Sequence, residues 1–220
     1  MLGLVKISGS YFSTYVNELE DFISTPLHGV VLMSGGGNIV RGREFSYSNR
    51  LFKDRMGIMS TVINGISLAE KFDAVSRKVH LASPVCAEDI INKYDPYVIK
   101  NILSYDHKTQ VILCGGLGWC GNLSTDTAMV VRALELSCTW VCKVSNVGGV
   151  FNDDPAISKS AKMMQKLTYA DAIQYKAYDA ASIVLARENK LKLMVTSLPN
   201  LKSHLIAGNF NSFCGTVIEE

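Results

Sequence analysis

The sequence predicts an α/β fold in which helices cover both faces of one largely parallel sheet. Short apolar runs rich in β-branched residues alternate with longer amphipathic stretches, a pattern typical of such folds. Glycine clusters follow several of the apolar runs, where a parallel sheet makes its strand-to-helix turns. With 220 residues, 48% of them hydrophobic and 19% charged, the chain can form one ordinary core. We therefore expect a single domain over residues 1–220.

The expected strands are short apolar runs, several of them bounded by glycine, proline or serine. In chain order they are Leu2–Ser8, Val30–Met33, Val79–Ala82, Val111–Cys114, Trp140–Val144, Leu193–Thr196 and Thr216–Ile218. Helical patterns fill most of the segments between them.

Periodicity and capping residues indicate three helices. The first covers residues 53–72, where apolar side chains recur close to the spacing of one helix face. Its apolar positions are Met56, Met59, Ile63 and Ile66. The second is expected to begin near Ser124, because serine is a good N-cap. The third runs from about residue 178 to 188.

Charge and composition exclude several classes of protein. The 22 basic and 20 acidic residues give a net charge of +2 and are spread along the chain, without the basic blocks of nucleic-acid or membrane-surface binders. The N-terminus reaches Lys6 too early for a signal peptide, and no stretch approaches the ~18 apolar residues of a membrane span. We therefore expect a cytoplasmic protein with no nucleic-acid or membrane partner.

The six cysteines include no Cys-x-x-Cys pair, and the histidines lie elsewhere in the sequence. This spacing argues against a metal site made by protein side chains and favours buried thiols in a reducing compartment.

Three glycine clusters follow predicted strands and are expected to line one crevice. They are Ser8-Gly9-Ser10, Gly35-Gly36-Gly37-Asn38 and the run from Gly115 to Asn122. Glycine lets backbone N–H groups approach a phosphate closely, and a helix that starts just beyond adds the positive end of its dipole. Any one cluster is equally well read as a tight turn without a ligand. Their repetition after strands favours phosphate binding.

Charged residues accompany these turns. Lys6 lies in the first strand, Arg41 follows the second turn and Asp54 begins the next helix. Lysine can bridge two phosphates as a compact charge, and arginine can hold one with two parallel hydrogen bonds. The role of an ordinary solvated surface charge fits Arg43 or Lys53 better than it fits Lys6, which lies inside an apolar strand. The phosphate-loop, dinucleotide-fold and protein-kinase motifs are absent from the sequence.

A series of motifs also occurs in a fixed order along the chain. They are Lys6-Ile-Ser-Gly9, Gly35-Gly-Gly-Asn-Ile-Val-Arg-Gly42, Asp54-Arg-Met-Gly-Ile-Met-Ser-Thr-Val-Ile-Asn-Gly65, Ser124-Thr-Asp126, Gly149-Val-Phe-Asn-Asp-Asp-Pro155, Leu167-Thr-Tyr169, and Asp179 ahead of Ala-Ser-Ile-Val-Leu-Ala-Arg187. In order and spacing the chain resembles the bacterial uridylate kinase family of the amino-acid-kinase superfamily, over nearly its whole length.

The resemblance implies a three-layer αβα sandwich with a mainly parallel central sheet, assembled as a homohexamer. It implies transfer of the γ-phosphate of ATP to UMP, which gives UDP for pyrimidine biosynthesis. Because transfer between two anions needs in-line positioning and nearby positive charge, we expect it to be direct. Mg²⁺ would be carried by ATP. An acceptor-side lobe would cover about residues 1–136 and a donor ATP-side lobe about residues 140–220.

Site residues follow from the same resemblance, position by position. The catalytic residues would be Lys6, Arg41, Asp126 and Asp179. The ATP-binding residues would be Lys6, Ile7, Ser8, Gly9, Gly37, Arg41, Ser145, Phe151 and Asp154. The UMP-binding residues would be Gly36, Asp54, Gly118, Asn122, Ser124 and Thr125. Trp119 in the acceptor loop either touches the base or packs beneath the loop, and packing is the expectation for an aromatic residue beside glycines.

The chain departs from the family pattern at two places, and two alternatives stay open. The segment between Gly9 and Gly35 is shorter than in the family, so we expect no activation by GTP in the usual way. The family's Thr-Lys-Val-Asp-Gly reads Ser145-Asn-Val-Gly-Gly149 here. A nucleotide-binding regulatory protein without catalysis would explain both departures. An acyl-phosphate-forming kinase of the same fold is the other alternative, although the motif at Asp54 favours a nucleotide acceptor.

Overall fold

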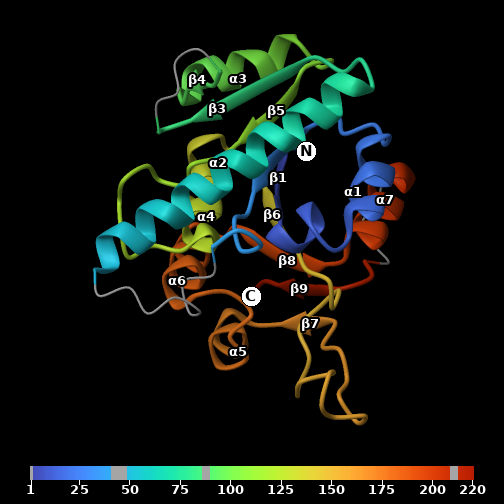
Figure 1. Ribbon diagram of the computed structural model, residues 1–220. Coiled ribbons are helices and arrows are strands. Elements are labelled where there is room, and N and C mark those ends of the chain that lie inside the picture. The colour runs from blue at the N-terminus through green and yellow to red at the C-terminus, as the bar shows by residue number, and fades with distance from the viewer. Residues whose placement is uncertain (1, 41–48, 86–89, 209–212) are drawn as a thin grey trace.

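The computed structural model describes residues 2–40, 49–85, 90–208 and 213–220, and within them it contains one nine-stranded sheet (Figure 1). The strands are β1 (Gly3–Ile7), β2 (Val30–Ser34), β3 (Val79–Ser83), β4 (Asn92–Lys93), β5 (Gln110–Leu113), β6 (Trp140–Val144), β7 (Lys166–Leu167), β8 (Lys192–Thr196) and β9 (Thr216–Ile218). The helices are η1 (Gly9–Phe12), α1 (Val16–Ile23), α2 (Arg50–Ala74), α3 (Pro96–Tyr105), α4 (Thr125–Glu135), α5 (Tyr169–Gln174), α6 (Ala180–Glu188) and α7 (Leu198–Ala207).

The strands lie in the order β4-β3-β5-β2-β1-β6-β8-β9-β7. Among the strand pairs of the described residues, only β8 and β9 run antiparallel. The seven predicted strands are confirmed to within a residue or two at each end. The two-residue strands β4 and β7 escape prediction because each pairs over only two residues, at the outer edges of the sheet.

Two apolar clusters, one on each face of the sheet, confirm the three-layer αβα arrangement. Strand residues point alternately to the two faces, so Leu4 and its neighbour Val5 fall in different clusters. One cluster includes Met129 of α4, and the other includes Phe22 of α1 and Phe72 of α2. The central strands are therefore buried on both sides, which explains their continuous apolar sequences.

Helix α2 is confirmed and extends beyond the predicted segment, but the apolar positions that indicated it do not face the sheet. Met59 and Ile63 are 41% and 52% exposed. The buried face carries Val62, Leu68 and Phe72 together with small polar residues. Asn64 Nδ2 donates to the carbonyl oxygen of Gly35 at 2.6 Å, and Thr61 Oγ1 accepts from the N–H of Gly115 at 2.9 Å. Polar side chains lie here because the glycine turns bring backbone groups that need partners.

Because the central strands are parallel, their carboxyl ends meet at one edge of the sheet. Ile7 pairs with Ser34 on one side and with Val144 on the other. The glycine turns beginning at Gly9, Gly35 and Gly115 all start at this edge. The fold therefore brings the three predicted turns together.

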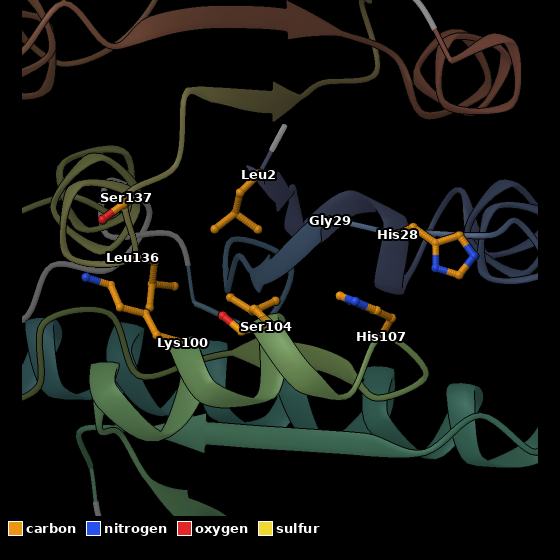
Figure 2. A pocket seen from close by; sticks show the side chains of 9 residues that line it. Leu2, His28, Gly29, Lys100, Ser104, His107, Leu136 and Ser137 are labelled. Carbon is orange, nitrogen blue, oxygen red and sulfur yellow. The ribbon is translucent and has the colours of Figure 1, made fainter.

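The opposite edge carries an open hollow of about 650 Å³ (Figure 2). Its lining includes Leu2 and Gly29, which precede β1 and β2, together with Lys100, His28 and His107. The hollow is thus separated by the sheet from the edge where the glycine turns lie.

The described helices include none with the length and apolar character that crossing a membrane requires. Cys114, Cys138 and Cys142 are buried, as expected, whereas Cys120 and Cys214 are exposed because they lie in loops. Cys86 lies outside the described residues.

Candidate active site

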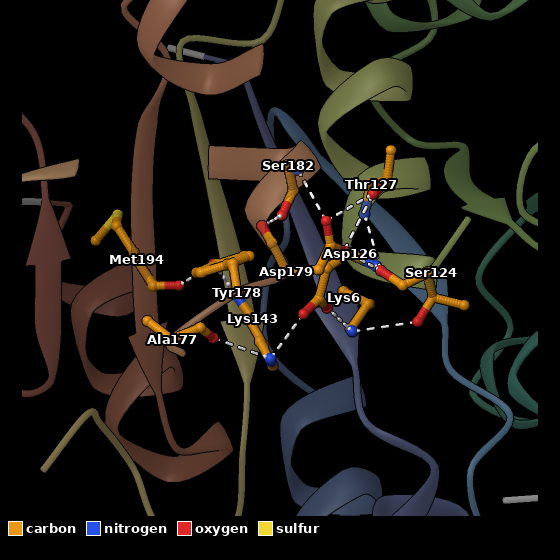
Figure 3. Close-up of polar contacts among 11 residues, drawn as sticks. Lys6, Ser124, Asp126, Thr127, Lys143, Ala177, Tyr178, Asp179, Ser182 and Met194 are labelled. Atoms are coloured by element: carbon orange, nitrogen blue, oxygen red, sulfur yellow. Dashed lines mark hydrogen bonds and ion pairs between the residues drawn. The ribbon is translucent and has the colours of Figure 1, made fainter. Parts of the chain in front are cut away.

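Lys6 and Asp126 form a buried ion pair at the carboxyl edge of the sheet (Figure 3). Lys6 is the fourth residue of β1 and only 7% exposed, and Asp126 is in the first turn of α4. The ammonium group of Lys6 donates to Oδ1 of Asp126 and lies 3.3 Å from Oγ1 of Thr125. The predicted catalytic residues Lys6 and Asp126 are thus in direct contact.

Ser124 fixes the start of α4. Its side-chain oxygen accepts from the backbone N–H groups of Asp126 and Thr127 at 2.9 and 3.2 Å, which confirms the predicted N-cap. Such a cap stabilises a helix by ~1 kcal/mol and sets where its first turn begins. The cap therefore determines that Asp126 faces Lys6.

Asp179 joins the same cluster from a different element. It caps α6 by accepting from the N–H of Ser182 at 2.9 Å. It also accepts hydrogen bonds from the hydroxyl groups of Ser124 and Thr127, the latter at 2.9 Å. The first turns of α4 and α6 are therefore held together by one carboxylate, as Figure 3 shows.

Lys143 is a cluster member that the motifs do not predict. It lies on β6 as the direct register partner of Lys6. Its Nζ is 2.7 Å from Oδ2 of Asp126 and 3.1 Å from the carbonyl oxygen of Ala177. A lysine inside an apolar strand is the signal that singles out Lys6, and the same signal is present at Lys143.

These contacts determine the charge states of the cluster. Burial alone would raise the pKa of Asp126, but the ammonium groups of Lys6 and Lys143 outweigh it and hold that pKa at about 2. Burial lowers the pKa of Lys6 from its ordinary value, and attraction to Asp126 offsets this only in part. For Asp179, hydrogen bonds from Ser124, Ser182 and Thr127 outweigh burial and lower the pKa. Both carboxylates are ionised at neutral pH.

The first two glycine turns pack closely against each other. A Cβ on Gly9 would lie 2.6 Å from the backbone N of Asn38, and a Cβ on Gly36 would lie 2.7 Å from Cβ of Ser60. Among the described residues, no atom lies within 4 Å of a Cβ placed on Gly37. Gly37 therefore borders open space at the carboxyl edge, which leaves room for an approaching ligand. Ser8 lies beside this turn, with its Oγ 3.0 Å from Oγ of Ser10.

The third glycine turn contacts the start of α2. Oδ2 of Asp54 accepts from the N–H of Asn122 at 3.1 Å. Gly118 and Asn122 both have positive φ angles, 74° and 68°, which give the loop its tight path. The expectation for Trp119 is wrong: this side chain is 51% exposed, and the guanidinium group of Arg55 lies 5.7 Å from its ring centroid.

The predicted donor-side residues lie on the segment that follows β6. The N–H of Ser145 donates to the carbonyl oxygen of Thr196 at 2.9 Å, which places Ser145 directly after the sheet. Phe151 forms an isolated antiparallel bridge with Met163, and Asp154 is exposed on the turn beyond. No hydrogen bond among the described residues joins these side chains to Lys6. Arg41 lies outside the described residues.

Within the described ranges, the histidine, cysteine and acidic side chains form no group of three or more that could hold a metal ion.

Comparisons with known proteins agree over most of the chain. The model of the amino acid kinase family matches residues 1–197. Uridylate kinase of Buchnera aphidicola subsp. Cinara cedri is 30% identical, over 98% of this chain and 96% of the relative. Uridylate kinase of Rhodopseudomonas palustris is 32% identical, over 89% of this chain and 87% of the relative.

Solved structures give the same result for the fold. The crystal structure of UMP kinase from Bacillus anthracis is similar, with a TM-score of 0.86 and 27% identity, over 99% of this chain and 95% of that one. The crystal structure of UMP kinase from Ureaplasma parvum has a TM-score of 0.86 at 23% identity. The match covers 100% of this chain and 99% of that one, and it supports the fold alone.

Proposed function

This chain belongs to the amino acid kinase family, and we propose that it is a uridylate kinase, which transfers the γ-phosphate of Mg-ATP to UMP. The observation that carries this proposal is the similarity to uridylate kinases over nearly the full length of both proteins. The lysine–aspartate cluster at the carboxyl edge of the sheet gives that similarity a chemical basis, because it places cations and glycine turns at one site.

The chemistry needed is mainly the control of charge. ATP and UMP are both anions, and phosphoryl transfer passes through a loose transition state that needs in-line positioning and nearby positive charge. The ammonium group of Lys6 would face the phosphates, and Gly37 would border them on the open side of its turn. Arg41 and the Mg²⁺ that arrives with ATP would add positive charge. Ser124 and Asp179 would hold the cluster in place.

Donor and acceptor would enter from the two sides of this cluster. ATP would contact Ile7, Ser8 and Gly9 at the end of β1, and its adenosine part would meet Ser145, Phe151 and Asp154. On the other side, UMP would lie against Gly36, Gly118, Asn122 and Thr125, with its ribose at Asp54. In this structure Asp54 accepts the N–H of Asn122, so nucleotide binding would change that contact.

The departures in the donor loop have local structural reasons, which favours an active kinase over a regulatory protein. Nδ2 of Asn146 is 3.4 Å from the hydroxyl oxygen of Tyr15. Gly148 has a φ of 75°, in the left-handed region that favours glycine. These residues therefore fit the loop of this chain and need not mark a lost site.

An acceptor screen tests the proposed function. Purified protein with Mg-ATP would be offered UMP, CMP, dUMP, carbamate and simple carboxylates, with hydroxylamine present in a parallel set to trap acyl phosphates. We expect UDP from UMP and no hydroxamate. Hydroxamate without UDP would establish the acyl-phosphate alternative, and UMP binding with no product from any acceptor would establish the regulatory one.

Direct transfer has its own test. The described cluster offers cations and carboxylates that are tied into hydrogen bonds, so we propose that no phosphoenzyme forms. ATP made chiral at the γ-phosphorus should transfer with inversion of configuration. Retention would rule out direct transfer.

We also propose that the chain is cytoplasmic and assembles as a homohexamer, and the exposed apolar side chains of α2 support a contact between copies. Exposed contiguous apolar surface often marks a protein–protein contact. The residues concerned are Leu51, Phe52, Met56, Met59, Ile63 and Ile66. A second copy of the chain would cover them.

A further inference from the structure

Lys143 makes contacts that an ordinary surface lysine lacks. Its side chain is 27% exposed, and its ammonium group lies 5.1 Å from the ring centroid of Tyr178. It also reaches Asp126 and the carbonyl oxygen of Ala177. The ring of Tyr178 is itself fixed, because its hydroxyl donates to the carbonyl oxygen of Met194 at 2.6 Å. The structure therefore holds Lys143 in one place (Figure 3).

The two oxygens of Asp126 are divided between two lysines. Oδ1 accepts from Lys6 and Oδ2 accepts from Lys143. A carboxylate held at both oxygens cannot rotate freely, so the contact with Lys143 also fixes the direction of the contact with Lys6. The Lys6 ammonium has three N–H groups. Among the described residues, Asp126 and Thr125 accept two of them. The third is left for a ligand.

The charge of the cluster depends on Lys143. In their ion-paired forms Lys6 and Lys143 contribute two positive charges, and the ionised Asp126 and Asp179 contribute two negative charges, so these four side chains sum to zero. Without Lys143 the sum would be −1, at the place where two phosphate-bearing anions have to meet. In a buried site such an excess charge is poorly screened.

On these grounds we propose that Lys143 is a positioning residue for phosphoryl transfer: it holds Asp126 so that Lys6 faces the phosphates, and it keeps the reaction centre from becoming negative. This inference rests on the proposed function. It assigns to Lys143 a role that acts through Asp126, not through direct contact with substrate.

The test compares Lys143→Met and Lys143→Arg with the wild type in steady-state assays of UDP formation. The loss of an outer-shell partner that orients a metal ligand typically lowers activity roughly 10- to 100-fold, and we take the same scale for a residue that orients Asp126. We expect Lys143→Met to lower kcat by that factor and to raise KM for ATP, with KM for UMP unchanged within about threefold. Lys143→Arg, which keeps the charge and a donor to Asp126, should recover most of kcat.

Lys192→Met is the matched control. Lys192 is also a strand lysine in an ion pair, with Nζ 2.9 Å from Oε2 of Glu219, but it begins β8 at the opposite edge of the sheet. The kcat of Lys192→Met should equal that of the wild type. Circular dichroism and thermal melting would be run on every variant, so that activities are compared only between folded proteins.

Lys143→Met in an Asp126→Asn background separates positioning from direct contact. If Lys143 acts through Asp126, the double variant should have a kcat less than about threefold below that of the Asp126→Asn single variant. The reason is that the effects of coupled residues are not additive. A full 10-fold or larger further loss would overturn the positioning role, as would an unchanged kcat in the single Lys143→Met variant.

Failure of the proposed function would look different. If the folded wild type forms no UDP, that function is wrong, and binding of Mg-ATP measured by calorimetry then decides the role of Lys143. A Kd at least fivefold weaker in Lys143→Met than in Lys192→Met would support the inference. Equal values would overturn it.

Discussion

Gly9 and Gly37 lie so close together that a Cβ on Gly9 would be 2.7 Å from the backbone N of Gly37. A Cβ on Gly37, by contrast, would meet no atom of the described part of the chain within 4 Å. The two glycines therefore serve different purposes in one turn: Gly9 permits close packing of backbone on backbone, and Gly37 borders the space proposed for the phosphates.

The first prediction uses this difference. Gly9→Ala should destabilise the fold, because backbone atoms cannot move aside as a flexible side chain can. Gly37→Ala should leave the thermal melting temperature within about 2 °C of the wild type, since surface-type changes usually alter stability by less than ~0.5 kcal/mol. It should nevertheless lower kcat/KM for ATP at least ~10-fold, because the new methyl group occupies the ligand's space. Full activity in a folded Gly37→Ala protein would place the phosphates elsewhere.

The second prediction concerns the acid stability of Asp126. Its pKa is about 2 in the folded protein, below the ordinary value of 3.8. A lowered pKa stabilises the fold at pH values above the ordinary pKa, and the contribution is lost as the pH falls towards 2. Asp126→Asn should be less stable than the wild type at pH 7, with a difference that shrinks by about 2 kcal/mol between pH 5 and pH 2.

Urea unfolding at a series of pH values measures this difference. The wild type and Asp126→Asn would be followed by circular dichroism, and the two free energies of unfolding subtracted at each pH. A difference that stays constant from pH 5 to pH 2 would show that the ion pair with Lys6 and Lys143 does not hold the carboxylate in its charged form.

The third prediction pairs two helix caps. Ser124 caps α4 and bonds to Asp179, whereas Asp95 caps α3 by accepting from the N–H of Tyr97 at 2.8 Å. Ser124→Ala and Asp95→Ala should each lower stability by ~1 kcal/mol, the usual cost of losing a cap. Only Ser124→Ala should also lower kcat, since only this cap positions Asp126. Equal effects on kcat would mean that the cap matters for folding alone.

The fourth prediction tests the exposed face of α2. A charge at Ile63, which is 52% exposed, should break a contact between copies of the chain. Size-exclusion chromatography with light scattering should show a large assembly for the wild type and smaller species for Ile63→Asp. Ile157→Asp is the control, because Ile157 is 84% exposed on a turn outside α2. An Ile63→Asp protein of wild-type size would exclude this face as the contact.

The order of strands along the chain could be predicted because buried parallel strands leave continuous apolar runs, as at Val30–Ser34. The buried face of α2 could not be predicted in this way. Besides its apolar contacts, this face bonds to the backbone of the glycine turns, so Thr61 and Asn64 are buried while Ile63 is exposed. A periodicity argument assumes that helices pack through apolar side chains, and α2 packs partly through hydrogen bonds.

Similar reasons explain which residues of the candidate site the sequence predicts and which it does not. Motif order predicts Lys6, Asp126 and Asp179, and the structure brings these three together. Lys143 was missed because it belongs to no motif, and its role depends on strand register, which places it beside Lys6 only once β1 and β6 are paired. For Trp119, the path of a loop is set by backbone angles that residue type alone does not determine.

The most direct measurement of the central claim is the rate of UDP formation from UMP and Mg-ATP by the wild type and by Lys6→Ala. We expect turnover by the wild type and a loss of at least ~100-fold in Lys6→Ala, the usual scale for removing one group that stabilises the transition state. Circular dichroism would confirm that both proteins are folded. No UDP from the folded wild type, or equal rates in the two proteins, would contradict that claim.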